Sequence, residues 1–322
     1  MPLDRRRLVL SAGITSAAFA LDGPLALFPA AQAAQFNNTT EPSVRRFKVG
    51  EIECIAVNDG LWEREHAEDF IANASVADTK KALEAGGMDP ARISMAMTVM
   101  IVKTGGKTYL IDTGTGGEVV KTAGTLLNSL KLAGITPEQI DGILLTHFHA
   151  DHIYGMMVGK TDERIFPNAQ MIMSETEFNY WTQPDIFKEQ PERRHSYIRR
   201  IHSFFPKWKN MCTLVAGEKD VLPGVRIIPA FGHSPGHSAF HISSGKDQFF
   251  YLGDTANIQA LFVPNPQWHV FYDQDGAVAE ASRRKLFDRV VAEGAIACCT
   301  HFAWPSMGKI SKDGKSYAYT AV

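Results

Sequence analysis

The sequence predicts an α/β fold whose chemical groups lie where strands end, and three observations support this. Apolar runs of strand length alternate with stretches whose apolar residues recur at helical spacing. One such run leads directly into the pattern His-x-His-x-Asp-His at residues 147–152. Other runs end in a single Asp or His. Because α/β sheets usually carry their ligands at strand ends, these polar residues mark the candidate site.

The expected elements follow one another regularly along the chain. A Gly105-Gly106 turn predicts a hairpin between two early strands. Thr136 followed by Pro137 is typical of a helix start. Strands are expected at 47–57, 95–111, 142–146, 169–173, 225–231, 238–243, 248–252 and 295–300, helices at 117–133 and 278–292, and a last strand after the polar turn at 312–315.

The segment 147–152 contains four side chains that can bind metal. Two histidines at i and i+2 of an extended segment project to the same side, and the following Asp-His can open a helix that faces the same point. Such ligands on either side of a gap suit two cations. Imidazole with some carboxylate favours zinc or a similar first-row metal. A His-rich polar loop is the alternative, but the rest of the chain supplies further ligands.

Four other segments offer those further groups. Asp112, Asp254 and His301 each stand at the end of an apolar run, where a strand would deliver them to one sheet edge. A Gly/Pro turn at 232–237 ends in His237 and also contains His233.

Taken in chain order, these segments resemble the five motifs of the metallo-β-lactamase superfamily. The resemblance covers essentially everything after the first thirty-odd residues, and it implies a four-layer αββα sandwich with a dinuclear metal site at the sheet edge. Within the superfamily, the general layout of the chain is most similar to methyl parathion hydrolase and to quorum-quenching lactonases. In the family's pattern the first metal would be bound by His147, His149 and His237, the second by Asp151, His152 and His301, and both by Asp254.

The resemblance also implies roles for residues around the metals. Asp112 is expected to hold the ligand loop and not to bind metal. His233 is expected to support the turn beside the ligand His237. Asp151 and Asp254 are ligands first, and they are also the candidate catalytic residues because a carboxylate beside the metals can move a proton. Zinc is the expected ion, and the same ligands also suit manganese, cobalt or iron.

Aromatic residues are concentrated at 174–210, where related enzymes place a helical cap beside the metals. Trp181 and Phe178 in this segment are the expected pocket residues. Tyr154 departs from the Gly that the family often has after the ligand His. Its ring either lines the pocket or packs outward.

The expected activity is metal-assisted hydrolysis by a hydroxide that bridges the two ions. The substrate is expected to be a small ester-type molecule: an organophosphate triester, a carboxylic ester or a lactone, with acyl-homoserine lactone hydrolysis as a specific alternative. A β-lactamase is less compatible with Asp151 beside His152. A redox di-iron protein on the same scaffold typically replaces the second His of the cluster with Glu, so His149 argues against it.

The N-terminus resembles an export signal. Arg5-Arg6-Arg7, an interrupted apolar stretch and Ala31-Gln32-Ala33 predict a twin-arginine leader at 1–33, which leaves one domain at 34–322. We therefore expect a periplasmic or secreted protein that is exported folded and has no stable membrane anchor. Its formal charge of −2 argues against nucleic acid as a partner. A homodimer and a disulfide among the four cysteines stay open.

Overall fold

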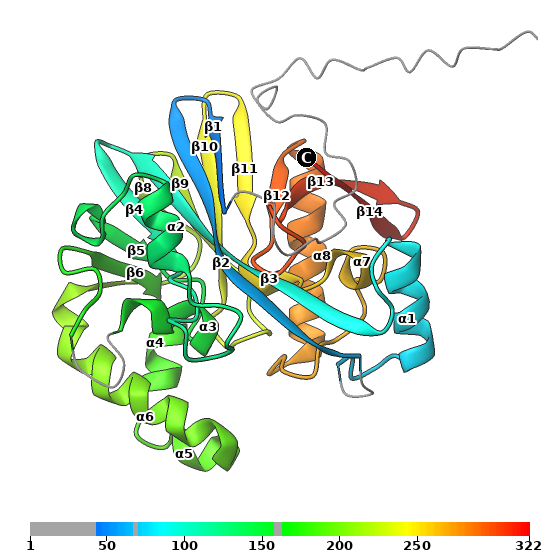
Figure 1. Cartoon of the computed structure of the whole chain (residues 1–322), viewed down its shortest axis with the longest axis horizontal. Coiled ribbons are helices and arrows are strands. Elements are labelled where there is room, and N and C mark those ends of the chain that lie inside the picture. Colours follow the sequence, from blue (N-terminus) through cyan, green and yellow to red (C-terminus); the bar gives the residue numbers. More distant parts are fainter. Residues whose placement is uncertain (1–42, 67–69, 158–162) are drawn as a thin grey trace, which may run out of the picture.

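The computed structural model describes residues 43–66, 70–157 and 163–322. The predicted leader at 1–33 lies outside these ranges. Two seven-stranded sheets face each other in the middle of the molecule, and helices cover the outer face of each (Figure 1). The expected αββα architecture is therefore confirmed. Within the described ranges, no helix combines the length and apolar character that a membrane crossing requires.

The first sheet contains the first seven strands in chain order. Strands β1 to β4 pair antiparallel, whereas β4, β5, β6 and β7 run parallel. The turn at Gly105-Gly106 joins β3 to β4, as predicted. Parallel pairing brings the carboxyl ends of β4 and β5 to the same edge. The strands are β1 (Val44–Val49), β2 (Ile52–Glu65), β3 (Arg92–Thr104), β4 (Lys107–Ile111), β5 (Gly142–Leu144), β6 (Gln170–Ser174) and β7 (Cys212–Val215).

The second sheet contains the last seven strands in the order β14-β13-β12-β11-β10-β9-β8. Its one parallel pair among these strands is β11 with β12, so the carboxyl ends of these two also lie side by side. The strands are β8 (Lys219–Leu222), β9 (Val225–Pro229), β10 (Ser238–Ser244), β11 (Asp247–Tyr251), β12 (Ile296–Cys298), β13 (Met307–Asp313) and β14 (Ser316–Ala321).

Three buried apolar clusters account for the layers. One fills the space between the sheets, where the rings of Phe47 and Phe249 lie 4.9 Å apart. The second lies between the first sheet and helices α2, α4 and α6, and the third between the second sheet and α1, α7 and α8 (Figure 1). The helices are α1 (Val76–Ala85), α2 (Leu126–Leu132), α3 (Ala150–Ile153), α4 (Glu175–Thr182), α5 (Ile186–Glu189), α6 (His195–Phe204), α7 (Gln259–Phe262) and α8 (Gly276–Ala292).

Two sequence-based helix predictions need correction. The helix expected at 117–133 is confined to α2 at its end, because the preceding loop is held in a non-helical shape by Gly117 and Gly124. A Cβ on Gly124 would lie 2.2 Å from the Cα of Gly117, so the loop closes on itself. The start at Thr136 leads only into a 3₁₀ turn, although its capping box is formed. Residues 174–210 contain helices, as expected.

Candidate metal centre

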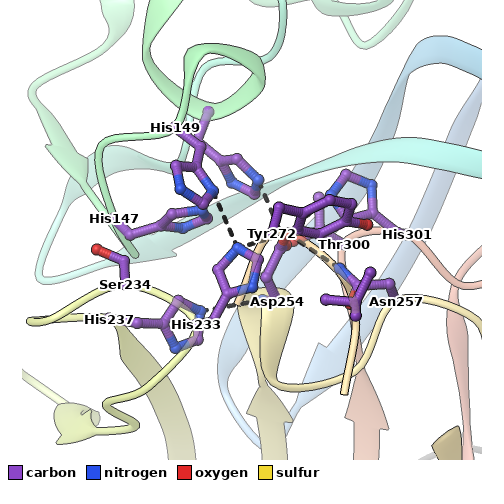
Figure 2. A network of polar contacts seen from close by, with 12 residues as sticks. His147, His149, His233, Ser234, His237, Asp254, Asn257, Tyr272, Thr300 and His301 are labelled. Carbon is purple, nitrogen blue, oxygen red and sulfur yellow. Dashed lines mark hydrogen bonds and ion pairs between the residues drawn. The ribbon is translucent and has the colours of Figure 1, made fainter. Parts of the chain in front are cut away.

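The ligand residues gather at the edge where the parallel strands of both sheets end. His147 comes three residues after β5, and the short helix α3 then presents Asp151 and His152. From the other sheet, Asp254 follows β11 and His301 follows β12. The two parallel pairs therefore bring side chains that are distant in sequence to one place (Figure 2).

Within the described residues, three overlapping groups have ligand atoms that all lie within 4.8 Å of one another. Asp254 connects them: Oδ1 lies 3.3 Å from Nε2 of His152, and Oδ2 lies 3.0 Å from Nε2 of His301. This is the position that a bridging carboxylate would occupy. The groups are His147, His149 and His233; His147, His152 and Asp254; and Asp151, His152 and His301.

Several buried atoms of this cluster have no hydrogen-bond partner in the described part of the chain. They are Nε2 of His147, His149 and His152, and Oδ1 of Asp254. Leaving a buried polar atom unsatisfied costs about 1–3 kcal/mol, so four at one point require an explanation. Bound cations supply one, because imidazole nitrogen and carboxylate oxygen are their ligands. The residues therefore fit a dinuclear metal centre.

Asp112 holds the ligand loop, as the resemblance implied. Its carboxylate accepts hydrogen bonds from the backbone N–H and the hydroxyl of Thr146, both at 2.8 Å, and from Nδ1 of His152 at 2.8 Å. The Thr146 hydroxyl in turn accepts from Nδ1 of His147 at 2.9 Å. These bonds place the protons on Nδ1, which leaves the Nε2 lone pairs of both histidines facing the centre.

The structure corrects the assignment of His237 as a ligand. Its Nδ1 donates to the carbonyl of Ala230 at 2.9 Å, and its Nε2 accepts the N–H of Asp254 at 3.0 Å, so both ring nitrogens are already used. Burial, followed by the nearby His233, lowers the pKa of His237 to about 3. His233 takes the ligand position instead, with Nε2 3.0 Å from Nδ1 of His149 and 3.3 Å from Oδ2 of Asp254 (Figure 2).

His233 is oriented by a carboxylate that sequence reasoning missed. Nδ1 of His233 donates to Asp273 at 2.9 Å, and the second oxygen of Asp273 lies 3.8 Å from the buried guanidinium of Arg283. A carboxylate behind a histidine fixes the ring and increases its basicity as a ligand. The sequence signal was weak: an Asp directly after the aromatic pair Phe271-Tyr272 and five residues before the predicted helix at 278–292.

The pKa values of the cluster's histidines are shifted in two opposite directions. Burial, with the neighbouring imidazoles, holds the pKa of His147 and of His149 well below the ordinary value, so both are neutral and ready to bind metal. For His152 and His301, burial alone would lower the pKa, but Asp254 and other nearby carboxylates raise it. Asp254 itself has a pKa well below the ordinary value, because these two imidazoles outweigh the effect of burial.

A cavity of about 220 Å³ opens beside this cluster, and both polar and apolar residues line it. The polar lining residues belong to the ligand cluster and are His149, Asp151, Asp254 and His301. The remaining wall is largely apolar and comes from β2, β3, the loop before α2 and the segment before α8. It consists of Trp62, Met95, Met97, Val119, Phe271 and Tyr272.

The three expected pocket residues lie elsewhere. Trp181 is fully buried behind His149, with 6.3 Å between their ring centroids, and its indole N–H donates to Glu177. Phe178 packs in the core under the cap. Tyr154 lies beneath the guanidinium of Arg200, 3.9 Å from its ring centroid, so it packs outward and does not line the cavity. The cap supports the ligands from behind and does not form the wall.

Comparisons with known proteins agree with this geometry. N-acyl homoserine lactonase of Bacillus cereus is 26% identical over 177 residues, which cover 55% of this chain and 61% of that protein. The Bacillus thuringiensis enzyme is 27% identical over 119 residues, 37% of this chain and 39% of that protein. In both cases the matched part is less than two thirds of the relative. The solved structure of AidC, described as a dizinc quorum-quenching lactonase in complex with a product, superposes with a TM-score of 0.81. It is 29% identical and covers 87% of this chain and 97% of its own.

The family model of the metallo-beta-lactamase superfamily matches residues 95–301, which is more than half of the chain. That range begins within β3 and ends at His301, so it includes every residue of the three ligand groups. The chain belongs to the metallo-beta-lactamase superfamily.

Proposed function

We propose that this protein is a dinuclear-metal hydrolase that opens lactone rings, with N-acyl homoserine lactones as its substrate class. The observation that carries the proposal is the cavity beside the ligand cluster, which is lined by carboxylates and imidazoles of that cluster and by a largely apolar set of other side chains. A lactone with an acyl chain has a polar reactive group and an apolar tail, so it matches both kinds of lining residue. The names of the similar proteins support the same substrate class.

The residues of the chain have distinct tasks in this reaction. Two bound divalent cations, with zinc as the proposed pair, would supply an activated water and polarise the attacked carbonyl. Asp254 would bind both ions and is 3% exposed, whereas Asp151 is 21% exposed and faces the cavity. Asp151 is therefore the better placed of the two carboxylates to pass a proton to the leaving alkoxide.

Tyr272 is a candidate for holding the substrate. It lines the cavity, and its ring lies 5.6 Å from that of His233. Burial, together with Asp254, raises its pKa well above the ordinary value, so the hydroxyl keeps its proton. A protonated hydroxyl there can donate a hydrogen bond to an ester oxygen.

The export of the protein and its location outside the cytoplasm are also proposals. We propose export of the folded protein through its twin-arginine leader to the periplasm or medium, where acyl lactones would reach it. Homodimer formation is a further proposal that gel filtration would test.

The decisive experiment compares kcat/KM of the zinc-loaded protein for an N-acyl homoserine lactone, an aryl carboxylic ester and an aryl dialkyl phosphate. We expect the lactone to be preferred by at least about tenfold. An Asp254→Asn variant measures background hydrolysis. Preference for the phosphate would replace the lactonase proposal with a phosphotriesterase. No turnover of any of the three by protein that binds two ions would refute an ester-type substrate class.

A further inference from the structure

Glu177, on the first turn of α4, touches both loops that carry the ligands of one metal subsite. Its carboxylate accepts the backbone N–H of Phe148 at 2.9 Å, between the ligands His147 and His149. It also accepts the N–H of Gly236 at 2.7 Å and the hydroxyl of Ser234, which follows His233. One side chain of the cap therefore connects a loop of the first sheet with a loop of the second.

The contact between the cap and the second loop is tight. A Cβ on Gly236 would lie 2.1 Å from the backbone nitrogen of Glu177, so the loop lies directly against α4. The indole N–H of Trp181 donates to Glu177 at 2.8 Å and fixes the carboxylate from its own helix. Glu177 is 1% exposed, so water cannot replace these bonds.

We propose that Glu177 is a positioning residue that holds His149 and His233 at the separation required to bind one of the two ions. The loops come from different sheets, and the two imidazoles face each other with nitrogens 3.0 Å apart. The cap thereby acts on the metal centre without touching it. This inference rests on the proposed metal centre, but not on the proposed substrate.

A carboxylate suits this position because it accepts only, with two oxygens and about four lone-pair directions. Its four donors at this position are two backbone N–H groups, a hydroxyl and an indole N–H. Glutamine is almost isosteric, but it would place an NH₂ group against at least one backbone N–H. Glu177→Gln therefore disturbs the position of the two loops relative to each other, while the side-chain volume is kept.

The experiment titrates metal-free protein with Co²⁺, using its visible absorption and a competing chelator, without substrate. For Glu177→Gln we expect one of the two binding steps to weaken by roughly tenfold to a hundredfold, the range for groups that support metal ligands, and the other to change little. Glu175→Gln is the matched control, because Glu175 is exposed on the same turn and should leave both steps unchanged.

A double variant identifies the subsite. In a His233→Ala background, which already lacks one ligand of that subsite, Glu177→Gln should cause no further loss at the remaining site. Ser234→Ala, which removes one donor to Glu177, should weaken the same step by a smaller factor, and it decides the matter if Glu177→Gln does not fold. Wild-type affinity at both steps in the folded Glu177→Gln protein, or in Ser234→Ala if only that folds, would overturn the proposal. Wild-type protein that binds two ions but hydrolyses no lactone would refute the substrate class alone.

Discussion

Replacing His233 or His237 by alanine should give opposite results, although the two residues lie on one turn. In His233→Ala a subsite loses one of its three histidine ligands, so only His147 and His149 remain there beside the bridging carboxylate of Asp254. Loss of a supporting residue already weakens metal binding by about tenfold to a hundredfold, so loss of a ligand should exceed that range. We expect His233→Ala to retain close to one tightly bound ion per chain.

His237→Ala should retain both ions but lose stability. The substitution leaves the carbonyl of Ala230 and the N–H of Asp254 without partners in a fully buried position. At about 1–3 kcal/mol for each unsatisfied group, the free energy of unfolding should fall by roughly 2–6 kcal/mol. Since about 1 kcal/mol shifts the Tm of a chain of this size by roughly 2 °C, the metal-free Tm should fall by at least several degrees.

The assay combines the metal content of dialysed protein, measured by elemental analysis, with thermal unfolding after chelation. His241→Ala serves as a control, because this buried histidine on β10 is not part of any ligand group. The reasoning fails if folded His237→Ala contains only one ion while His233→Ala contains two. Equal loss of metal from both variants would show that the turn acts as a unit and that the hydrogen bonds of His237 do not exclude it from the centre.

Four further predictions follow from the same geometry. Asp273→Asn should weaken the His233 subsite by roughly tenfold or more in a cobalt titration, since the ring loses its carboxylate partner; unchanged affinity would contradict that role. Phe271→Ala should raise KM for long-chain lactones by about fivefold with kcat nearly constant, because a partly exposed ring at the cavity contributes about 1 kcal/mol of binding. An equal increase in KM for short-chain lactones would argue against contact between Phe271 and the acyl chain. Chelation should lower Tm and zinc should restore it, with about 2.7 kcal/mol gained per site at a hundredfold excess over Kd, and a Tm that ignores chelator would exclude tight binding. Burial holds the pKa of His241 below its ordinary 6.5, so below that pH the unfolded chain binds a proton that the folded protein does not, and the free energy of unfolding falls as pH falls. In denaturant titrations at several pH values, His241→Phe should reduce the dependence of this free energy on pH by at most about 1.4 kcal/mol per pH unit. An unchanged pH dependence would refute this assignment.

Strand-end residues were predictable from the sequence because the signal is local. Asp112, Asp254 and His301 each follow an apolar run, and the structure brings all three to one edge through the parallel pairs of the two sheets. The His-x-His-x-Asp-His cluster was equally clear, since its spacing alone places the side chains on one side of a strand end. Residues outside such runs, including Asp273 and Glu177, act through contacts that link distant segments, so no local pattern pointed to them.

The choice between His233 and His237 illustrates what local sequence cannot decide. Both stand on one Gly/Pro turn, and the resemblance to the family led us to expect the ligand at His237. The deciding contacts come from elsewhere: Gly232 has a φ of +120°, and a Cβ there would lie 2.0 Å from the backbone nitrogen of Ala279 in α8. That packing turns His233 toward Asp273 and the metal cluster.

The pocket wall escaped prediction for a related reason. Aromatic residues in 174–210 are numerous, but Trp181 is buried and donates its indole N–H to the carboxylate of Glu177. The wall instead uses Trp62 on β2 and alternate residues of β3, Met95 and Met97. Alternation alone says that two such residues share a face, not which face borders the metals. Here the register of β2 against β3 shifts between Asn58 and Leu61, and this irregularity precedes Trp62, which pairs with Met95. Since a single-residue slip exchanges the faces of a strand, the identity of the wall depends on a feature that only the paired sheet reveals.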